Sequence, residues 1–224
     1  MLRECDLSEI SDGKKYTLSD MVKADCGDCK GCSQCCQDMG ESIVLDPLDV
    51  HRISTHLGKR FEALLESEIE LHIVDGVILP NLKMTPVSQE HARCVFLNEE
   101  GRCSIHAHRP GICRIFPLGR IYEDRDFSYI LQIHECKLEN RSKVKVSKWI
   151  DTPDVKKNQM FIKDWHYFLK DVHAMLVEKA DEGLIKTVTM QLLQYFYIEP
   201  YTVERDFYEQ FYERLDKTKK LLGV

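Results

Sequence analysis

The distribution of cysteine is the feature that most constrains this chain. The 224 residues include ten cysteines, five of which lie between Cys26 and Cys36, and none follows Cys136. A chain of this length with 43% hydrophobic residues can bury a core without help from disulfides. We therefore expect local chemistry, rather than a disulfide scaffold, to explain why the cysteines are clustered.

Hydropathy and charge restrict the cellular location and the binding partners that we expect for this protein. No segment approaches the roughly 18 apolar residues of a membrane helix, and no secretory signal is visible near the N-terminus. We therefore expect a cytoplasmic protein without membrane association, in a compartment where clustered thiols stay reduced and more often bind metal than pair. The net charge of −6 weighs against nucleic acid as the main partner.

The run CGDCKGCSQCC consists of overlapping C-x-x-C units. Each unit lets two thiolates converge on one ion, and Gly27 and Gly31 permit the tight turns that this requires. Three such steps can hold three corners of an iron–sulfur cubane, whose fourth ligand then comes from elsewhere in the chain. The same spacing can supply half of a zinc site, and the remaining alternative is a redox dithiol or unpaired thiols. The candidate ligands in the run are Cys29, Cys32, Cys35 and Cys36.

A second set of cysteines follows at wider spacing and brings the candidate ligands to eight. Eight thiols are enough for two four-ligand sites, or for one site with redox-active or reserve thiols beside it. Adjacent side chains diverge in an extended backbone, so we expect Cys35 and Cys36 to serve different sites or different roles. Cys26 and Cys5 are left outside the ligand set. The second set is Cys94, Cys103, Cys113 and Cys136.

Basic side chains and histidines lie among these cysteines. Arg93, Arg102 and Arg114 each adjoin a cysteine of the second set and would offset the negative charge of bound thiolates, although solvated surface arginines explain the pattern equally well. Histidine can ligate zinc and, more rarely, an iron–sulfur cluster. For any single histidine here, a surface or core role is the simpler interpretation. The histidines concerned are His91, His106 and His108.

The pattern of elements predicts an α+β fold, with an irregular cysteine-rich metal-binding core and short hairpins packed against a helical C-terminal half. A short strand at 43–45 precedes a helix from Asp46 to Gly58 and a second helix over 61–69. Asp75-Gly76 predicts a hairpin within 72–79. Two more hairpins are expected over 93–105 and 119–133, with a short helical turn between Arg109 and Pro117.

The sequence beyond about residue 150 predicts helices. Apolar residues recur at helical spacing from Thr152-Pro153 to Leu176, from Leu184 to Phe196 and from Val203 to Leu222. We therefore divide the chain into a cysteine-cluster metal-binding region, residues 1–150, and a helical region, residues 151–224. No linker separates the regions, so we expect them to pack as one unit.

The ordered motifs resemble those of one family. They are Cys29-x-x-Cys32-x-x-Cys35-Cys36, Cys94-Val-Phe-Leu, Gly101-Arg-Cys103-Ser-Ile and Arg109-Pro110-x-x-Cys113-Arg114-x-Phe116-Pro117. Together they are similar to the YkgJ-type CxxCxxCC cysteine-cluster family, a zinc- or iron-chelating domain related to the flagellin lysine N-methylases. The resemblance covers residues 26–136.

The leading hypothesis is a metal-binding protein that holds an iron–sulfur cluster through part of the eight-cysteine set. A zinc-stabilised structural or interaction protein is the first alternative. The resemblance also implies a third reading, a cluster-dependent protein-modifying enzyme such as a lysine N-methyltransferase that uses S-adenosylmethionine. That reading would require a protein substrate or partner. The chain has no Walker loop, dinucleotide fingerprint, nucleophile elbow or H-E-x-x-H motif.

Overall fold

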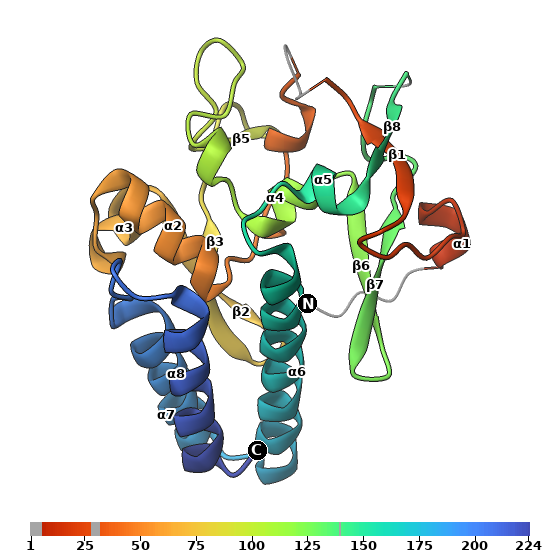
Figure 1. The fold of residues 1–224 in the computed structure, drawn as a ribbon. Coiled ribbons are helices and arrows are strands. Elements are labelled where there is room, and N and C mark those ends of the chain that lie inside the picture. Colours follow the sequence, from red (N-terminus) through yellow and green to blue (C-terminus); the bar gives the residue numbers. More distant parts are fainter. Residues whose placement is uncertain (1–5, 28–31, 139) are drawn as a thin grey trace. The chain divides into compact units, whose positions relative to one another are not determined.

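The computed structural model describes residues 6–27, 32–138 and 140–224 (Figure 1). The fold is α+β, as expected, with short antiparallel strand pairs and a helical C-terminal half. The chain forms two compact units. One contains Val44–Leu82 and Lys156–Val224, and the other contains the described residues up to Ile43 together with Lys83–Val155. The division at residue 150, with both regions packed as one unit, stays a prediction.

The first unit begins with helix α2, Pro47–Leu57, whose limits follow from its capping residues. The Asp46 side chain accepts a hydrogen bond from the Asp49 amide at 2.8 Å, and the Asp49 side chain accepts one from the Asp46 amide at 3.3 Å. This reciprocal pair satisfies amides that the first turn leaves without helical partners. Gly58 ends the helix with φ 65°, so the predicted helix is confirmed. Helix α3, Phe61–Ser67, follows.

A hairpin comes next along the chain. Strands β2, Ile69–Val74, and β3, Val77–Leu82, pair antiparallel in continuous register. Asp75 and Gly76 both have positive φ, 48° and 83°, which is the two-residue turn that matches strand twist. The predicted hairpin is confirmed, and it is longer than 72–79. The strand expected at 43–45 is reduced to a single bridge between Val44 and Asn81.

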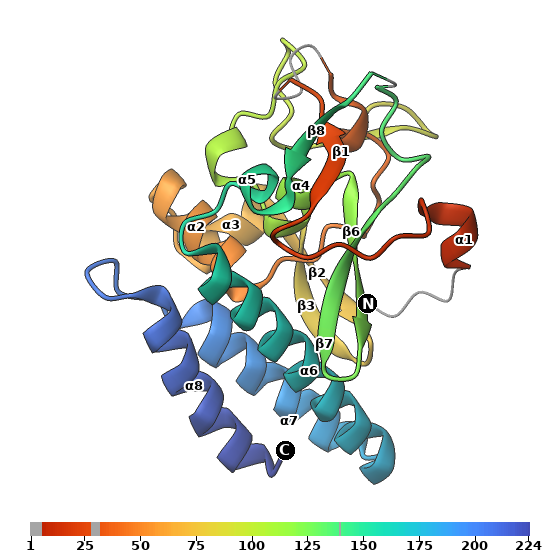
Figure 2. The ribbon, with the colours of Figure 1, turned by 45° about the vertical axis from the view of Figure 1, so that its right-hand side comes forward.

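Three helices complete the first unit and lie side by side (Figure 2): α6, Val155–Lys179, α7, Glu182–Leu193, and α8, Phe207–Leu222. Their contact is aromatic, with the Phe161 and Phe211 rings 4.6 Å apart and the Trp165 and Phe196 rings 4.8 Å apart. Such edge-on and tilted pairs add stabilisation beyond simple burial. Strand β3 packs against α7, so the hairpin and the helices share one core. A π-helical turn, Gln194–Ile198, continues α7.

The second unit is built from strand pairs and short helices. Strand β1, Met21–Asp25, pairs with β8, Ser142–Lys145, and β6, Leu118–Glu123, pairs with β7, Asp126–Leu131. The N-terminal arm, with helix α1, Leu7–Ile10, is attached to β7 and the residue after it by single bridges. Strand β4, Met84–Pro86, pairs with β5, Ala92–Cys94. The hairpin expected within 119–133 is thereby confirmed.

Two short helices of the second unit are joined by side-chain hydrogen bonds to backbone carbonyls. Helix α4, Gly111–Ile115, begins after Pro110 as predicted, and helix α5 is Val146–Ile150. Arg114 of α4 is buried and donates to the carbonyls of Asp151, at 2.8 Å, and Ala107. Trp149 of α5 donates to the Ile115 carbonyl at 3.1 Å. These bonds fix both helices against the surrounding loops.

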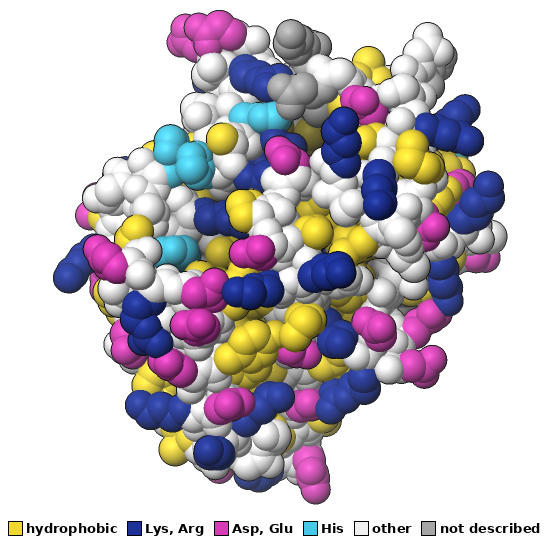
Figure 3. All heavy atoms as spheres, in the orientation of Figure 1, with side chains coloured by type: hydrophobic (Ala, Val, Ile, Leu, Met, Phe, Trp, Pro, Cys, Tyr) yellow, Lys and Arg dark blue, Asp and Glu magenta, His cyan; other side chains and the backbone are white. Residues whose placement is uncertain are grey.

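The surface carries charges of both signs. Figure 3 shows basic and acidic side chains interspersed over the face that it presents. None of the helices in the described part of the chain has the length and apolar character needed to cross a membrane.

Alkaline pH should destabilise the first unit through Tyr197. This side chain is buried, its hydroxyl donates to the Leu45 carbonyl at 3.1 Å, and burial raises its pKa well above 10. Above about pH 10 the unfolded chain loses a proton that the folded chain keeps, so the free energy of unfolding falls as pH rises. One such tyrosine contributes at most about 1.4 kcal/mol per pH unit.

Urea unfolding at about pH 8 and about pH 11 checks this expectation. At the lower pH, Tyr197→Phe should lower the free energy of unfolding by about 1 kcal/mol, because a hydrogen bond is lost. The additional decrease between the lower and the higher pH should be smaller in this variant than in the unmodified chain. Tyr195→Phe, at a half-buried position in the same segment, is the control. If the higher pH lowers the free energy of unfolding of Tyr197→Phe as much as that of the unmodified chain, Tyr197 is not the source of the alkaline destabilisation.

Arg114 should be needed for the stability of the second unit. Lysine cannot reproduce the two directed hydrogen bonds of the guanidinium, so Arg114→Lys should lower the free energy of unfolding by about 2 kcal/mol. Arg93→Lys, at an exposed position, should change it by less than about 0.5 kcal/mol. Chemical denaturation of metal-free protein measures both values, and equal effects would show that the buried bonds contribute nothing.

Candidate metal centre

The end of the cysteine run forms a 3-10 turn, Gln34–Cys36, in which the Cys36 amide donates to the Ser33 carbonyl at 2.9 Å. The expected extended backbone at Cys35 and Cys36 is therefore wrong. The turn brings the two side chains together, and their sulfurs share a hydrogen bond. Adjacent thiols are close neighbours in this turn because its backbone curls instead of alternating.

The turn is attached to strand β5 by the two residues that follow it. Gln37 and Arg93 form an antiparallel bridge. Asp38 donates its amide to the Ala92 carbonyl at 2.8 Å, and its carboxylate accepts from the Ala92 amide, also at 2.8 Å. Cys36 precedes Gln37 and Cys94 follows Arg93, so each cysteine adjoins a residue of this bridge. We call these contacts, between residues 37–38 and 92–93, the Asp38 clamp.

Cys103 is brought back to the same strand by the loop after β5. Leu97 and Cys103 form an antiparallel bridge, and the Ser104 amide donates to the Phe96 carbonyl at 2.8 Å. The Asn98 side chain closes the turn by accepting from the Arg102 amide at 2.8 Å. A turn runs from Asn98 to Gly101, whereas the hairpin expected over 93–105 is reduced to one bridge. The bridge brings the segments that carry Cys94 and Cys103 together.

The thiols in this region influence one another electrostatically. The pKa of Cys35 is raised, mainly because its thiol hydrogen-bonds to Cys36 and secondly by burial. Burial raises the pKa of Cys94 to about 11 and also raises that of Cys103, and the neighbouring thiol charges of the set add to both shifts. Cys35, Cys36, Cys94 and Cys103 therefore form one electrostatically coupled group, which we call the four-thiol group.

Arg109 is a cation close to this group. It lowers the pKa of both Cys35 and Cys103, against the larger effects of burial and thiol contact, and Arg102 acts on Cys103 in the same direction. Its guanidinium donates to the His106 carbonyl at 2.9 Å, which holds the side chain in place. Sequence adjacency indicated Arg93, Arg102 and Arg114 as compensating cations. It missed Arg109 in this role because Arg109 adjoins no cysteine.

The arginine and histidine neighbours have other partners that explain their positions. Arg114 donates to the carbonyls of Asp151 and Ala107, as described above. His91 lies 3.0 Å from the Asp38 carboxylate and so adds to the Asp38 clamp. Both ring nitrogens of His106 lie within 2.9 Å of the Arg109 guanidinium. His91 and His106 thus each have a neighbouring side chain that explains their position.

The remaining candidate cysteines come from other segments of the chain. Cys113 lies in α4, Cys136 follows β7, and Cys32 precedes the 3-10 turn; all three are half-buried and free of disulfides. Cys29 lies outside the residues that the structure describes. So does Cys5, which is not part of the ligand set. Within residues 6–27, 32–138 and 140–224, no three Cys, His, Asp or Glu side chains are gathered as a complete metal-ion site.

The donor set nevertheless fits a soft metal. Thiolates are the ligands that zinc and iron–sulfur clusters take in proteins, and a bound cation removes their protons outright. Burial and the hydrogen bond between Cys35 and Cys36 raise the pKa values of Cys35, Cys94 and Cys103, with a smaller part from the neighbouring thiols, and a cation between them would offset this cost of ionisation. In its absence the protonated thiols are the favoured form.

Comparison with known proteins places the chain in a family. A search of curated proteins and a search of solved structures each found none. A family model with the description "CxxCxxCC: Putative zinc- or iron-chelating domain" matches residues 28–145. This range is more than half of the chain, contains all eight candidate ligands and leaves out Cys26 and Cys5. With the motif order and the four-thiol group in agreement, the chain belongs to the CxxCxxCC family of zinc- or iron-chelating domains.

Proposed function

We propose that this protein is an iron–sulfur protein whose cluster is bound in the second unit. The observation that carries the proposal is the Asp38 clamp, which attaches the end of the C-x-x-C-x-x-C-C run to the strand that carries Cys94. A cubane takes three ligands from such a run and one from elsewhere in the chain. Cys94 and Cys103, which are electrostatically coupled to Cys35, are the candidates for that outside ligand.

The proposed ligand set keeps all eight cysteines of the family motif, with unequal roles. The four-thiol group forms the centre of the site, and Cys29 and Cys32 extend it along the run by their spacing. Cys113 and Cys136 are reserve or second-site ligands. The full set is Cys29, Cys32, Cys35, Cys36, Cys94, Cys103, Cys113 and Cys136.

Charge and burial support a cluster at this place. Cys94 is buried, and Cys35 and Cys103 are largely shielded, so their thiolates lie in a medium that makes uncompensated charge costly. Four thiolates around a cubane leave a net negative charge, and Arg109 lies where it can offset part of it. Burial, charge and nearby donors are also the means by which a protein tunes a cluster's potential.

A structural zinc site is the second candidate function. The observation that favours it is that the four-thiol group contains as many thiols as a closed tetrahedral zinc site takes. In that case the run and β5 would be joined by the ion itself, and metal binding would contribute directly to folding of the second unit. The chain would then serve as an interaction or structural protein, and its partner would be a protein.

Metal and acid-labile sulfide analysis of protein purified without oxygen distinguishes these functions. We expect about four iron and four sulfide per chain, with absorbance near 400 nm that disappears on oxidation. One or two zinc ions per chain, with no sulfide and no colour, would replace the first proposal with the second. Protein that binds neither metal after anaerobic reconstitution would overturn both.

Ligand substitutions test where the metal is bound. Cys94→Ser and Cys103→Ser should each reduce bound metal at least about tenfold at limiting metal, because a hydroxyl is a poor ligand for these soft ions. Cys5→Ser, outside the family motif, is the matched control and should leave metal content unchanged.

Fluorescence of Trp149, a half-buried residue of the second unit, distinguishes loss of a ligand from loss of that unit's fold. If Cys5→Ser loses metal while Cys94→Ser and Cys103→Ser keep it, the four-thiol group is not the site.

A further inference from the structure

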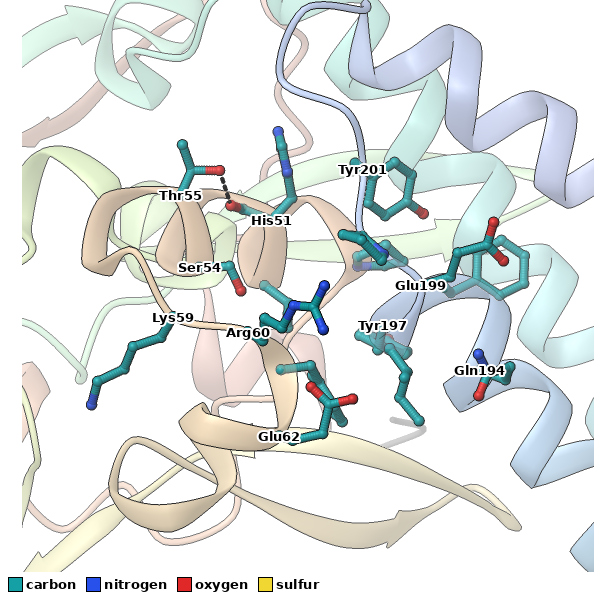
Figure 4. Close-up of a pocket in the computed structure, with 16 residues that line it drawn as sticks. His51, Ser54, Thr55, Lys59, Arg60, Glu62, Gln194, Tyr197, Glu199 and Tyr201 are labelled. Carbon is teal, nitrogen blue, oxygen red and sulfur yellow. Dashed lines mark hydrogen bonds between the residues drawn. The ribbon is translucent and has the colours of Figure 1, made fainter.

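The first unit contains a pocket that the metal-binding function does not use. Its volume is about 450 Å³, and it lies between helix α2, the start of α3 and residues 194–201 (Figure 4). Small-molecule sites in proteins have volumes of roughly 300–1,000 Å³ and combine apolar walls with a few polar groups. Every residue that lines this pocket belongs to the first unit, so the pocket is complete within that unit.

One wall of the pocket is shaped by the π-helical turn. The Glu199 amide donates to the Gln194 carbonyl at 2.9 Å, which widens the helix by one residue and exposes aromatic side chains toward α2. Arg214 of α8 fixes this wall, because its guanidinium donates to the carbonyls of Tyr195, Glu199 and Pro200 at 2.7–2.8 Å. π-turns of this kind are rare and often occur at functional sites.

Aromatic rings provide the apolar surface and hold a histidine in the pocket. Phe61, Phe196 and Tyr197 line it and are themselves buried. The His51 ring stacks on Phe207 with centroids 5.4 Å apart and meets Tyr201 edge-on at 5.7 Å. Burial and the charges of Arg52 and Arg214 lower the pKa of His51, so the imidazole is neutral near pH 7. A neutral imidazole can both donate and accept a hydrogen bond.

The charged groups of the pocket are unequally paired. Lys59 points away in Figure 4 and forms an ion pair with Glu68 at 2.6 Å. Arg60 reaches into the space between α2 and the segment that carries Tyr197, and within the described residues its guanidinium has no hydrogen bond or ion pair. The carboxylates of Glu62 and Glu199 also lack an ion pair there. The pocket therefore presents one unengaged cation and two unengaged carboxylates beside an aromatic wall.

We propose that this pocket binds a free α-amino acid with a large apolar side chain, of the leucine or phenylalanine class. An arginine fork pairs with a carboxylate through two parallel hydrogen bonds, which assigns the ligand's carboxylate to Arg60. The ammonium group is assigned to Glu199 or Glu62, and the apolar side chain to the aromatic wall. A phosphate or dicarboxylate is disfavoured by the two carboxylates of the pocket, and a plain hydrocarbon would make no use of the three charged groups, which are exposed.

Isothermal titration of the full chain with L-phenylalanine and L-leucine tests this proposal. We expect saturable binding at one site, with an affinity at least about tenfold greater than that for three partial ligands. These are 3-phenylpropionate, which lacks the ammonium, 2-phenylethylamine, which lacks the carboxylate, and glycine, which lacks the apolar side chain. No binding of either amino acid, or equal binding of 3-phenylpropionate, would overturn the proposal.

Variants locate the site. Arg60→Gln and the double variant Glu62→Gln/Glu199→Gln should each weaken binding of L-phenylalanine at least about tenfold, because each removes the charged partner of one ligand group. Glu66→Gln, also at an exposed position of α3 but outside the pocket, is the matched control and should bind as the unmodified chain does.

Unchanged affinity in Arg60→Gln would place any binding elsewhere and overturn the assignment. The titrations need no bound metal, so their outcome is independent of whether the second unit holds iron or zinc.

Discussion

The Asp38 clamp joins two segments that are more than fifty residues apart, and the proposed metal centre depends on that contact. A cysteine run can curl around an ion by itself, but it cannot supply a buried outside ligand. The attachment consists of the bridge between Gln37 and Arg93, the hydrogen bond from the Asp38 amide to the Ala92 carbonyl, and the hydrogen bond from the Ala92 amide to the Asp38 carboxylate. Backbone pairing is directional, so it sets the register of Cys36 against Cys94 before any metal binds. The loop closed by Asn98 then returns Cys103 to the same place.

Three thiols of the four-thiol group, Cys35, Cys94 and Cys103, lie in surroundings that disfavour their ionisation. Burial and thiol contacts raise the pKa values of Cys35, Cys94 and Cys103, and Arg109 offsets only part of this effect. The same arrangement that protects the metal-free thiols from ionising makes a cation favourable once it arrives, because its charge replaces the protons. Compensation by Arg109 rather than Arg114 is consistent with this balance. Arg114 is committed to backbone carbonyls, whereas Arg109 lies beside the sulfurs.

Local signals in the sequence predicted most elements of the fold. The capping residues Asp46 and Gly58, the Asp75-Gly76 turn and the helical spacing of the C-terminal half each act over a few residues, and each is confirmed. The strand at 43–45 was reduced to a bridge because its pairing depends on a distant residue, Asn81. The backbone at Cys35 and Cys36 was mispredicted because the argument assumed an extended conformation where Ser33 begins a tight turn. Arg109 was missed as a counter-charge because proximity in space was inferred from adjacency in sequence.

The pocket of the first unit was beyond any such local reasoning. Its walls come from residues 47–62 and 194–201, segments that no motif connects, and its shape depends on one extra residue in a helical turn. Most of the aromatic residues between 195 and 212 are core residues. Phe196 and Tyr197 line the pocket and also pack on Trp165. A π-turn in a packed aromatic helix therefore lets residues line a pocket while they remain in the core.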